Sequence, residues 1–495
     1  MLTQALRDAR RFEEEKEREI TPDQRPKYHL STRVGWLNDP NGFCYYQGKY
    51  HLFYQYHPYN SHWGPMHWGH AVSMDLIHWE YLPCVMAPDQ PYDRDGCYSG
   101  SSLTLPDGGH LLMYTGVVNE ETDGVMRGVQ TQCLAIGDGR DYDKYENNPV
   151  LSLSDIPEGS SKYDFRDPKM WQGKDGRYYA VAVTNNSSKG GGQVLLFVSE
   201  DGFKWGYETT IASNDDRIGR MWECPDFFEL DGKDVLMCSA MDMLPQDLKY
   251  YNGNGTFYII GEYDPDRGVF KEETDHAVDY GIDFYAPQTI CTPDGRRIMI
   301  AWMQNWDTCN LHTPDVPWFG QMTIPRELSI KDGRLYQKPV QEIEQFREGY
   351  VSHKDVRFSD GEISLPGVKG RCVDMTLTIK PAEDKVYQKF ALRFAENAKY
   401  HTAVSFRPHE GILKIDRKFS GSRRAIIHQR RAAVGCKDGC IRMRLLLDRF
   451  SAEIFVGEGE KVMTTTITTE MSADDITFFV DGSAYISVEK YDLVM

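Results

Sequence analysis

The 495-residue sequence has no long hydrophobic run, and no stretch of it approaches the roughly 20 apolar residues that a membrane span needs. The N-terminal segment MLTQALRDARRFEEEKEREI also lacks an apolar run of signal-peptide length. Basic residues are scarce, since 56 Lys and Arg stand against 74 Asp and Glu, which gives a net charge of −18. A broad basic surface is therefore excluded, and we expect neither nucleic acid nor a membrane as partner.

Paired cysteines and compact metal-binding motifs are also missing. The eleven cysteines are odd in number and form no CxxC pair or regular framework. Cys436 and Cys440 in CKDGC are typical of a turn between strands rather than half of a zinc site. We therefore expect reduced thiols and, with no signal peptide, a cytoplasmic protein.

A histidine-rich stretch, HLFYQYHPYNSHWGPMHWGH, does not change this interpretation. Its spacing contains no close ligand pair such as HExxH, and the interleaved Trp, Tyr and Gly favour a sugar-facing hairpin. We expect no metal and no cofactor. The histidines are His51, His57, His62, His67 and His70.

The chain is instead rich in aromatic residues, with 29 Tyr, 22 Phe and 10 Trp, which suit strands and sites that stack on sugars. From about residue 28 onward, short β-rich runs such as YYAVAV alternate with Gly, Asp, Asn and Pro turns. SMDLIHW (residues 73–79) and SEDGFKW (residues 199–205) repeat a Ser-x-Asp…Trp pattern after an apolar strand. Such repeats indicate a β-propeller, and its length allows five or six blades.

The organisation that we predict is all-β. Residues 1–27 form an N-terminal helical extension, a surface appendage with a weak apolar stripe. Residues 28–337 form the propeller and 338–352 a linker with a short helical tendency. Residues 353–495 form a β-sandwich, because Val373, Met375, Leu377 and Ile379 alternate with polar residues.

Three acidic residues lie in proline-containing turns beside aromatic strands: Asp39 in WLNDPNG, Asp167 in FRDP and Glu223 in WECPD. Each alone is explained by ordinary turn formation. In separate blades, however, all three converge at one end of the propeller axis. Clustered carboxylates suit glycoside hydrolysis, in which one group stays ionised and another carries a proton to the leaving oxygen.

The two roles require unlike surroundings. We expect Asn38, Asn41 and nearby backbone amides to keep Asp39 ionised, and Trp222 with the other acids to keep Glu223 protonated.

The segments HLSTRVGWLNDPNG, FRDPK, MWECPD, FYAPQT and IPREL follow one another over residues 29–328. As a set they resemble glycoside hydrolase family 32, the invertases, fructosidases and sucrose-6-phosphate hydrolases, and EIFVGEGE resembles the family's C-terminal sandwich. The resemblance implies a five-bladed propeller with a sandwich. Within it, Asp39 would be the nucleophile, Glu223 the acid/base, and Asp167 the carboxylate that stabilises the transition state.

The resemblance also implies a set of sugar-binding positions. The match is less simple at two of these positions, Trp302 and Ser99. The nearby Trp306 competes with Trp302 for the same position, and the motif CYSGSS around Ser99 has Tyr98 where Phe is common. The sugar-binding positions are Asn38, Gln55, Trp63, Ser99, Arg166, Tyr285 and Trp302.

The activity that the resemblance implies is retaining hydrolysis of a β-fructofuranosyl bond through a covalent fructosyl-enzyme. The substrate would be sucrose, sucrose 6-phosphate or a short fructo-oligosaccharide. The alternatives are an inverting arabinan- or xylan-cleaving propeller, a transfructosylase, and a non-catalytic fructan-binding protein with a lectin-like sandwich. Exposed faces of the sandwich would also permit a homodimer.

Overall fold

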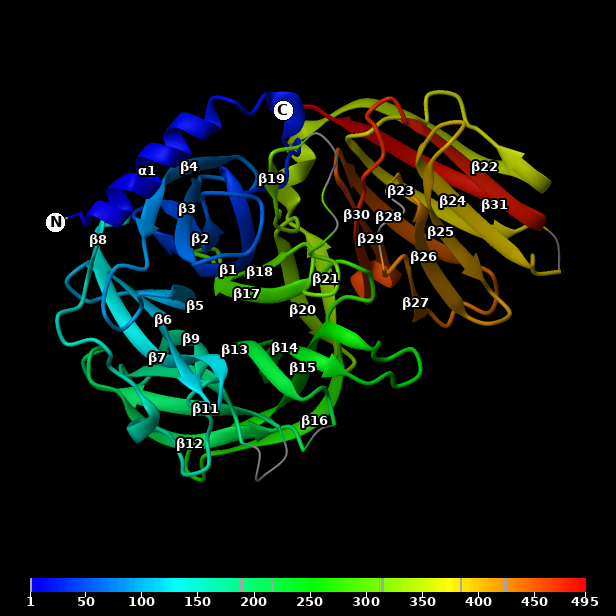
Figure 1. Ribbon diagram of the computed structural model, residues 1–495. Helices are drawn as coiled ribbons and strands as arrows, with labels where there is room; N and C mark the ends of the chain where they lie inside the picture. Colours follow the sequence, from blue (N-terminus) through cyan, green and yellow to red (C-terminus); the bar gives the residue numbers. More distant parts are fainter. Residues whose placement is uncertain are drawn as a thin grey trace.

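The computed structural model describes residues 2–186, 191–215, 217–310, 312, 316–382, 385–421 and 426–495. Strands dominate it, and they form a β-propeller followed by a C-terminal β-sandwich (Figure 1). The all-β prediction is therefore confirmed. In Figure 1 the blue-to-green part of the chain runs around the propeller, and the yellow-to-red part forms the sandwich at its side.

Five sheets make up the propeller, each with four antiparallel strands in chain order. The first sheet gains a fifth strand, β19 (Trp318–Phe319), which comes from the segment of the last blade and pairs in parallel with β1. The blades are β1 (Gly35–Tyr46), β2 (Lys49–His57), β3 (His67–Ser73) and β4 (Trp79–Met86); β5 (Gly96–Thr104), β6 (His110–Thr122), β7 (Val125–Gly137) and β8 (Tyr142–Lys144); β9 (Arg166–Gln172), β10 (Tyr178–Asn185), β11 (Gly192–Ser199) and β12 (Gly206–Ser213); β13 (Met221–Leu230), β14 (Lys233–Met243), β15 (Gly253–Asp264) and β16 (Val269–Ala277); β17 (Tyr285–Cys291), β18 (Arg297–Trp302), β20 (Arg326–Lys331) and β21 (Arg334–Pro339).

The first strands of the blades surround the propeller axis. Contacts run from β1 to β5, from β5 to β9, from β9 to β13, from β13 to β17 and from β17 back to β1. These contacts close a ring of five first strands, which settles the number of blades at five. Side chains at the start of each first strand therefore face one shared space.

The repeated Ser-x-Asp…Trp pattern marks the same turn in two blades. After β3, the Asp75 carboxylate accepts the backbone N–H groups of Ile77 and His78, and the Trp79 indole donates to the Leu76 carbonyl. After β11, Asp201 accepts the N–H groups two and three residues further on, and the following Trp donates to a turn carbonyl in the same way. The sequence repeat therefore reflects a structural repeat that joins the third and fourth strands of a blade.

The N-terminal helix α1 (Gln4–Glu17) is more than the predicted surface appendage. Its buried residues are Leu6, Ala9 and Glu13. Glu13 accepts hydrogen bonds from Arg33, at 2.9 Å, and from the Cys84 backbone N–H, also at 2.9 Å. The charged stretch thus supplies a buried ion pair that fixes the helix to the first blade, a contact that helical periodicity does not reveal.

In the sandwich, one long strand belongs to both layers. The first part of β31 (Asp475–Leu493) pairs with β24, and its second part pairs with β23, while β22 runs along its other edge. The remaining strands extend outward from these two in a single ten-stranded sheet that folds over on itself. The strands are β22 (Arg347–Ile363), β23 (Val373–Pro381), β24 (Lys389–Glu396), β25 (His401–Arg407), β26 (Ile412–Phe419), β27 (Gln429–Ala433), β28 (Ile441–Asp448), β29 (Ser451–Val456) and β30 (Lys461–Thr466).

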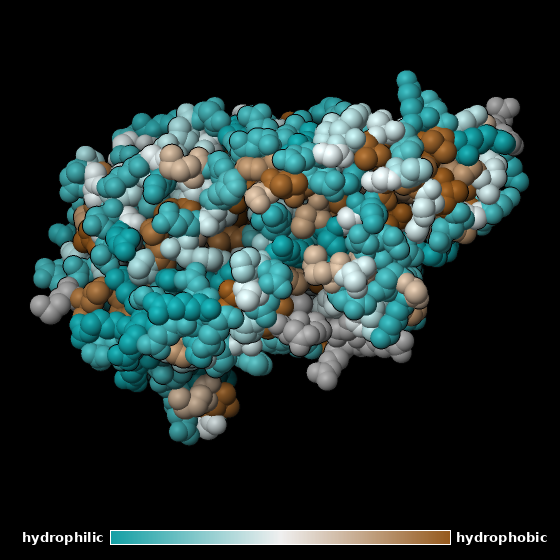
Figure 2. Space-filling model, turned by 90° about the horizontal axis from the view of Figure 1, so that it is seen from above, coloured by the Kyte–Doolittle hydropathy of each residue, from teal (hydrophilic) through white to brown (hydrophobic). Residues whose placement is uncertain are grey.

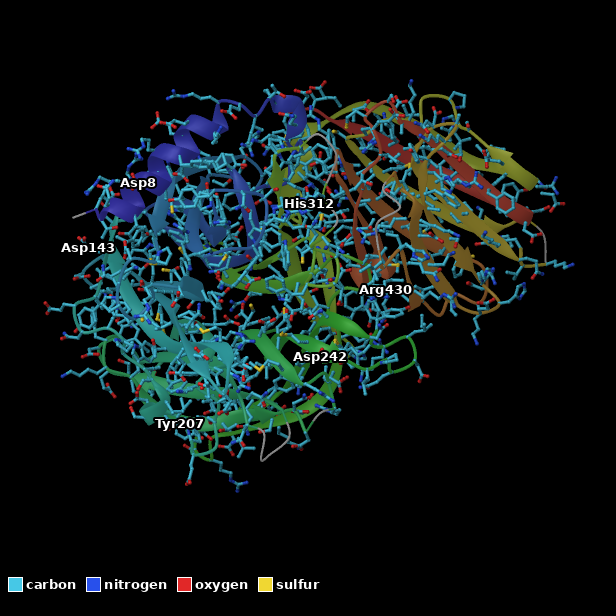
Figure 3. All side chains as sticks on the ribbon, in the orientation of Figure 1. Asp8, Asp143, Tyr207, Asp242, His312 and Arg430 are labelled. Carbon is cyan, nitrogen blue, oxygen red and sulfur yellow. The ribbon has the colours of Figure 1, made fainter. Side chains whose placement is uncertain are left out.

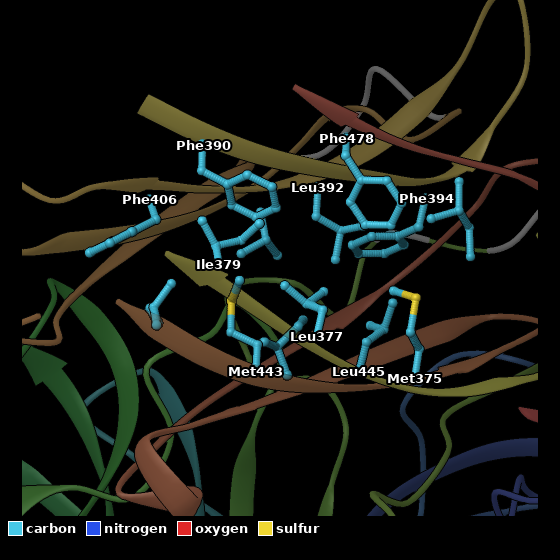
Figure 4. Packing of buried hydrophobic residues seen from close by; sticks show 14 of the residues in the cluster. Met375, Leu377, Ile379, Phe390, Leu392, Phe394, Phe406, Met443, Leu445 and Phe478 are labelled. Carbon is cyan, nitrogen blue, oxygen red and sulfur yellow. The ribbon is translucent and has the colours of Figure 1, made fainter. Parts of the chain in front are cut away.

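Figure 4 shows the sandwich core between the two layers, with Phe390, Leu392 and Phe478 facing Leu377 and Leu445. The alternating residues of the predicted strand CVDMTLTIK are all buried there. Short 3-10 helices occur in the connections: η1 (Pro22–Gln24), η2 (Leu153–Asp155), η3 (Gln341–Phe346) and η4 (Gly457–Gly459). Of these, η3 lies between the last strand of the propeller, β21, and the first strand of the sandwich, β22.

Buried charges connect the propeller to the sandwich. His29 lies between two sandwich carboxylates, with 2.8 Å from Nδ1 to Asp448 and 2.8 Å from Nε2 to Glu453. Burial alone would lower the pKa of His29, but the hydrogen bonds to both carboxylates raise it to about 9. Arg326, fully buried, pairs with Glu453 and, at 3.0 Å, with Asp279. Because each of these ions depends on a partner from the other part of the chain, separating the two parts would leave unpaired buried charges.

The molecular surface is mostly hydrophilic, with apolar residues scattered between polar ones in the face that Figure 2 shows. Every helix in the described residues is too short or too polar to span a membrane. All eleven cysteines are free, and Cys436 and Cys440 lie in the turn between β27 and β28.

Candidate active site

Each first strand of a blade carries an irregularity near its start, where the regular pairing with its neighbour is interrupted. The interruptions fall between Leu37 and Pro40, between Tyr98 and Gly100, between Arg166 and Lys169, between Glu223 and Asp226, and between Tyr285 and Gln288. In four of the five a proline follows the central residue, and in three the residue before that proline has a positive φ: Asp167, Cys224 and Ala286. Bulges of this kind redirect side chains away from the regular sheet and are frequent beside active sites.

Aligning the five bulges on these prolines, with Gly100 in place of the proline in the second blade, gives two sets of equivalent positions around the axis. Glu223 belongs to the first set, and Asp39 and Asp167 belong to the second. The first set, which we call the outer ring, is Asn38, Tyr98, Arg166, Glu223 and Tyr285; the second, the inner ring, is Asp39, Ser99, Asp167, Cys224 and Ala286.

A small cavity lies against the inner ring. Its volume is about 10 Å³, roughly the space that one water molecule needs. All five blades contribute to its wall, which consists of Pro40, Ser99, Gly100, Asp167, Lys169, Cys224, Pro225, Ala286, Pro287 and Gln288.

Asp39 is buried and surrounded by hydrogen-bond donors. Ser99 donates to Oδ2 at 2.6 Å, Asn38 donates to Oδ1 at 3.1 Å, and the Cys224 thiol lies 3.4 Å from Oδ2. Asn38 is oriented in turn by the Trp36 indole, which donates to its amide oxygen at 2.8 Å. These donors hold the carboxylate in one orientation.

The expectation for Asn41 was wrong. Its amide oxygen accepts from the Gly100 backbone N–H at 3.3 Å, so Asn41 contacts the next blade rather than Asp39. The physical reason is the bulge, which turns the chain between residues 37 and 41 so that Asn38 and Asn41 address different neighbours.

Asp167 lies close to the same thiol. The Cys224 backbone N–H donates to Asp167 Oδ2 at 2.9 Å, the Cys224 sulfur lies 3.6 Å from the same oxygen, and Arg166 Nε lies 3.7 Å from it. Its own backbone N–H donates to Thr115 at 3.0 Å. Cys224 therefore joins the two aspartates, and no reasoning from the sequence had singled it out, although it lies within the motif WECPD.

Glu223 is paired with Arg166, whose Nη2 and Nε lie 3.1 and 3.3 Å from Oε1. Its second oxygen accepts the Tyr285 hydroxyl at 2.7 Å and the Trp306 indole N–H at 3.3 Å. The expected role of Trp222 was wrong, because that indole is fully buried and donates to the Ile218 carbonyl instead. In β13, neighbouring side chains point to opposite faces of the sheet, so Trp222 points away from the side that carries Glu223.

The predicted sugar-binding residues differ in how near they lie to the acids. Four of them, Asn38, Ser99, Arg166 and Tyr285, contact an acid directly. Trp63 is half exposed and packs edge-on against Tyr98, with 6.1 Å between ring centroids. Gln55 is buried and donates to the Cys97 carbonyl at 3.0 Å.

Of the two competing tryptophans, Trp306 makes the contact with Glu223. Trp302 is fully buried and packs against Trp306 at 5.2 Å between ring centroids and against Trp36 at 6.1 Å. Trp302 therefore packs beneath Trp306 and, among the described residues, does not contact an acid itself. Trp306, on the loop after β18, presents its N–H to the carboxylate.

The histidine-rich stretch forms strands β2 and β3, but not all of its histidines face the site as predicted. His51 and His70 are buried, 3.0 Å apart between ring nitrogens, and stack on Phe53 in the packing between the first two blades together with His110. Burial lowers the pKa of His51 to about 4. The alternation of side chains along β2 and β3 turns these residues toward the neighbouring blade.

The electrostatics of the acid cluster predict a pH dependence. Burial raises the pKa of Asp39 to about 6, with Glu223 adding to the shift against the donors from Ser99 and Asn38. Burial likewise raises the pKa of Asp167 to about 7, and Glu223 and Asp39 add to this shift while Arg166 opposes it. If Asp39 acts as the nucleophile, its ionised form is lost as pH falls through these values, so kcat/KM should then decrease about tenfold per pH unit below pH 6. A pH profile of kcat/KM measures this, and a flat profile between pH 7 and about pH 5 would contradict it.

Buried carboxylates on separate strands, oriented by donors and lined by Trp and Tyr, define a site that can attack and protonate a glycosidic bond. The comparisons agree. The Glycosyl hydrolases family 32 N-terminal domain matches residues 29–339, and the Glycosyl hydrolases family 32 C terminal domain matches residues 342–493. The chain is thus a glycoside hydrolase, and it belongs to glycoside hydrolase family 32.

Among its relatives, the raffinose invertase of Escherichia coli is 34% identical over 459 residues, covering 89% of each chain. The sucrose-6-phosphate hydrolase of Bacillus subtilis is 32% identical over 496 residues, covering 98% of each. A variant of the Bombyx mori GH32 beta-fructofuranosidase BmSUC1, solved in complex with sucrose, matches with a TM-score of 0.84 and 35% identity over 100% of this chain and 99% of the other. Family membership and fold are therefore established over nearly the whole chain.

Proposed function

We propose that this enzyme hydrolyses the β-fructofuranosyl bond of sucrose, sucrose 6-phosphate or short fructo-oligosaccharides by retaining double displacement. The observation that carries the proposal is the linkage of three acids from three blades through two side chains. Arg166 contacts Glu223 and Asp167, and Cys224 contacts Asp167 and Asp39. One furanose ring would span such a cluster.

In the first step, Asp39 attacks the anomeric C2 of the fructosyl unit, and Glu223 protonates the oxygen of the leaving group. A C2–Oδ bond forms as the C2–O glycosidic bond breaks, which gives a covalent fructosyl-enzyme and a free sugar hydroxyl. The burial of Asp39 favours this step, because a poorly solvated carboxylate loses little hydration when it forms the ester.

In the second step, Glu223 removes a proton from a water molecule that attacks C2, and the ester to Asp39 breaks. Positive charge develops at C2 in both transition states. The nearby Asp167 carboxylate would stabilise that charge through the fructosyl hydroxyls. Burial raises the pKa of Asp167 to about 7, while the neighbouring Arg166 opposes this rise and favours the ionised form.

The names of relatives support this substrate class, since they include a raffinose invertase, sucrose-6-phosphate hydrolases and a levanase. Sucrose, sucrose 6-phosphate and fructo-oligosaccharides share the fructofuranosyl unit and differ in the leaving group. We therefore expect fructose to be released from sucrose, from sucrose 6-phosphate and from a short fructo-oligosaccharide. Comparing kcat/KM for the three with that for an arabino-oligosaccharide tests the proposal, and cleavage of the arabinoside alone would overturn it.

A further inference from the structure

Beneath the inner ring, the position after each bulge proline defines a third set of equivalent residues. It is Asn41, Ser101, Lys169, Asp226 and Gln288, and polar contacts of its members cross from blade to blade. Lys169, from the third blade, lies 3.5 Å from Asp226 of the fourth and donates to the Thr289 carbonyl of the fifth at 2.7 Å. The acids thus stand on a polar layer rather than on an apolar core.

In this layer, Gln288 forms hydrogen bonds to residues that are far from it in the sequence. Its amide NH₂ donates to the Gly100 carbonyl at 2.9 Å, and its amide oxygen accepts the Phe43 backbone N–H at 2.9 Å. One side chain of the fifth blade therefore binds the first strands of the first and second blades at once. Those two strands carry Asp39 and Ser99.

Gly100 is the point at which these contacts meet. Its N–H donates to Asn41 and its carbonyl accepts from Gln288, so both sides of this residue are held. A Cβ atom at Gly100 would lie 1.9 Å from the Met113 carbonyl oxygen, so only glycine fits between β5 and β6 here. Ser99, the preceding residue, donates to Asp39 at 2.6 Å.

We propose that Gln288 is a positioning residue, which acts through Gly100 and Phe43 to fix Ser99 against Asp39. The inference rests on the proposed function in that Asp39 is the nucleophile. Gln288 lines the small axial cavity together with Ser99 and Asp167 but contacts none of the three acids in the described structure. Its effect on the reaction must therefore come from the placement of the strands.

Replacing Gln288 with Met keeps the length of the side chain and removes both hydrogen bonds. We expect kcat/KM to fall about 10- to 100-fold, mainly through kcat, because a small displacement of a nucleophile from its line of attack has an effect of that size. We also expect the acid limb of the pH profile to move to higher pH, since a displaced Ser99 no longer donates to the Asp39 carboxylate. Gln288→Glu keeps the acceptor for Phe43 but places an oxygen against the Gly100 carbonyl, so its acid limb should move further.

The matched control is Gln193→Met, which removes a buried amide whose NH₂ donates to Ser213 at 3.0 Å within its own blade. A loss of packing alone would lower the thermal midpoint in both Met variants and leave both acid limbs in place. That outcome, or an unchanged kcat in Gln288→Met, would overturn the proposal. If Asp39 were not the nucleophile, Asp39→Asn would remain active whatever Gln288 does, so the two failures are distinguishable.

Discussion

Asp39→Asn is expected to lower kcat by about 10⁴-fold or more, because removal of an attacking group has an effect of that order in other enzymes. The amide keeps the shape of the side chain and an acceptor oxygen for Asn38, and its NH₂ can donate to the Ser99 hydroxyl, but it cannot form the ester with C2. Initial rates with sucrose, measured at enzyme concentrations high enough to detect the residual activity, give the result. Turnover within tenfold of the unaltered enzyme would contradict the role of Asp39.

The same variant is expected to unfold at a higher temperature than the unaltered enzyme near pH 8. In the folded state the pKa of Asp39 is raised from its ordinary value of 3.8 to about 6. The protonated Asp39 side chain therefore contributes its full stability below pH 3.8, and this contribution is lost as pH rises through about 6. The neutral amide escapes this cost, which is at most about 3 kcal/mol for a shift of roughly two pKa units. Thermal melts at pH 8 and at pH 4 should show a gain that decreases toward the lower pH. A lower melting temperature at pH 8 would show instead that the inactive variant is damaged.

Glu223→Gln is expected to reduce hydrolysis of sucrose by about 10²- to 10⁴-fold, the range found for loss of a general acid or base. The amide can still accept hydrogen bonds from Tyr285 and Trp306, but it cannot protonate the leaving oxygen. A fructoside with a leaving group that needs no protonation, such as fluoride, should therefore form the fructosyl-enzyme at a nearly normal rate. Its hydrolysis should then be slow, and a burst followed by slow turnover is the expected kinetic pattern.

A suitable control for this variant is Glu229→Gln. Glu229 lies further along the same strand β13, is exposed and pairs with Lys174 on the surface. It should retain full activity with both substrates. Loss of the fructosyl fluoride burst in Glu223→Gln, to the same degree as the loss of sucrose cleavage, would indicate a binding or folding defect, which would remove the acid/base assignment.

The fold class could be predicted from the sequence, and the three acids could be singled out as candidates, because both depend on local signals. Alternating apolar residues mark strands, and an acid one or two residues before a proline marks a turn at the start of a strand. The repeat SMDLIHW and SEDGFKW proved to be the same turn in two blades. By contrast, the charged residues of α1 predicted a surface appendage. The buried Glu13 pairs with Arg33, which lies outside the helix, so the periodicity of the helix does not reveal this contact.

The contacts between blades could not be predicted from local signals, because each depends on a neighbour that is distant in the sequence. Cys224 approaches Asp39 across 185 positions of the chain, and Gln288 reaches Gly100 across 188. The same reason explains the errors for Asn41 and Trp222, which are next to the acids in sequence but turn elsewhere at the bulges. An alignment of the five bulges identifies both Cys224 and Gln288. Cys224 holds the position equivalent to Asp39 and Asp167, and Gln288 holds the position equivalent to Asn41.

Asp39 should become covalently fructosylated during turnover. Glu223→Gln mixed with fructosyl fluoride, quenched in acid within the burst, digested and examined by mass spectrometry should give a peptide that contains Asp39 and one added fructosyl unit. The adduct should be missing when Asp39 is replaced as well. Fructose release without any adduct on Asp39, or with the adduct on another residue, would contradict the mechanism.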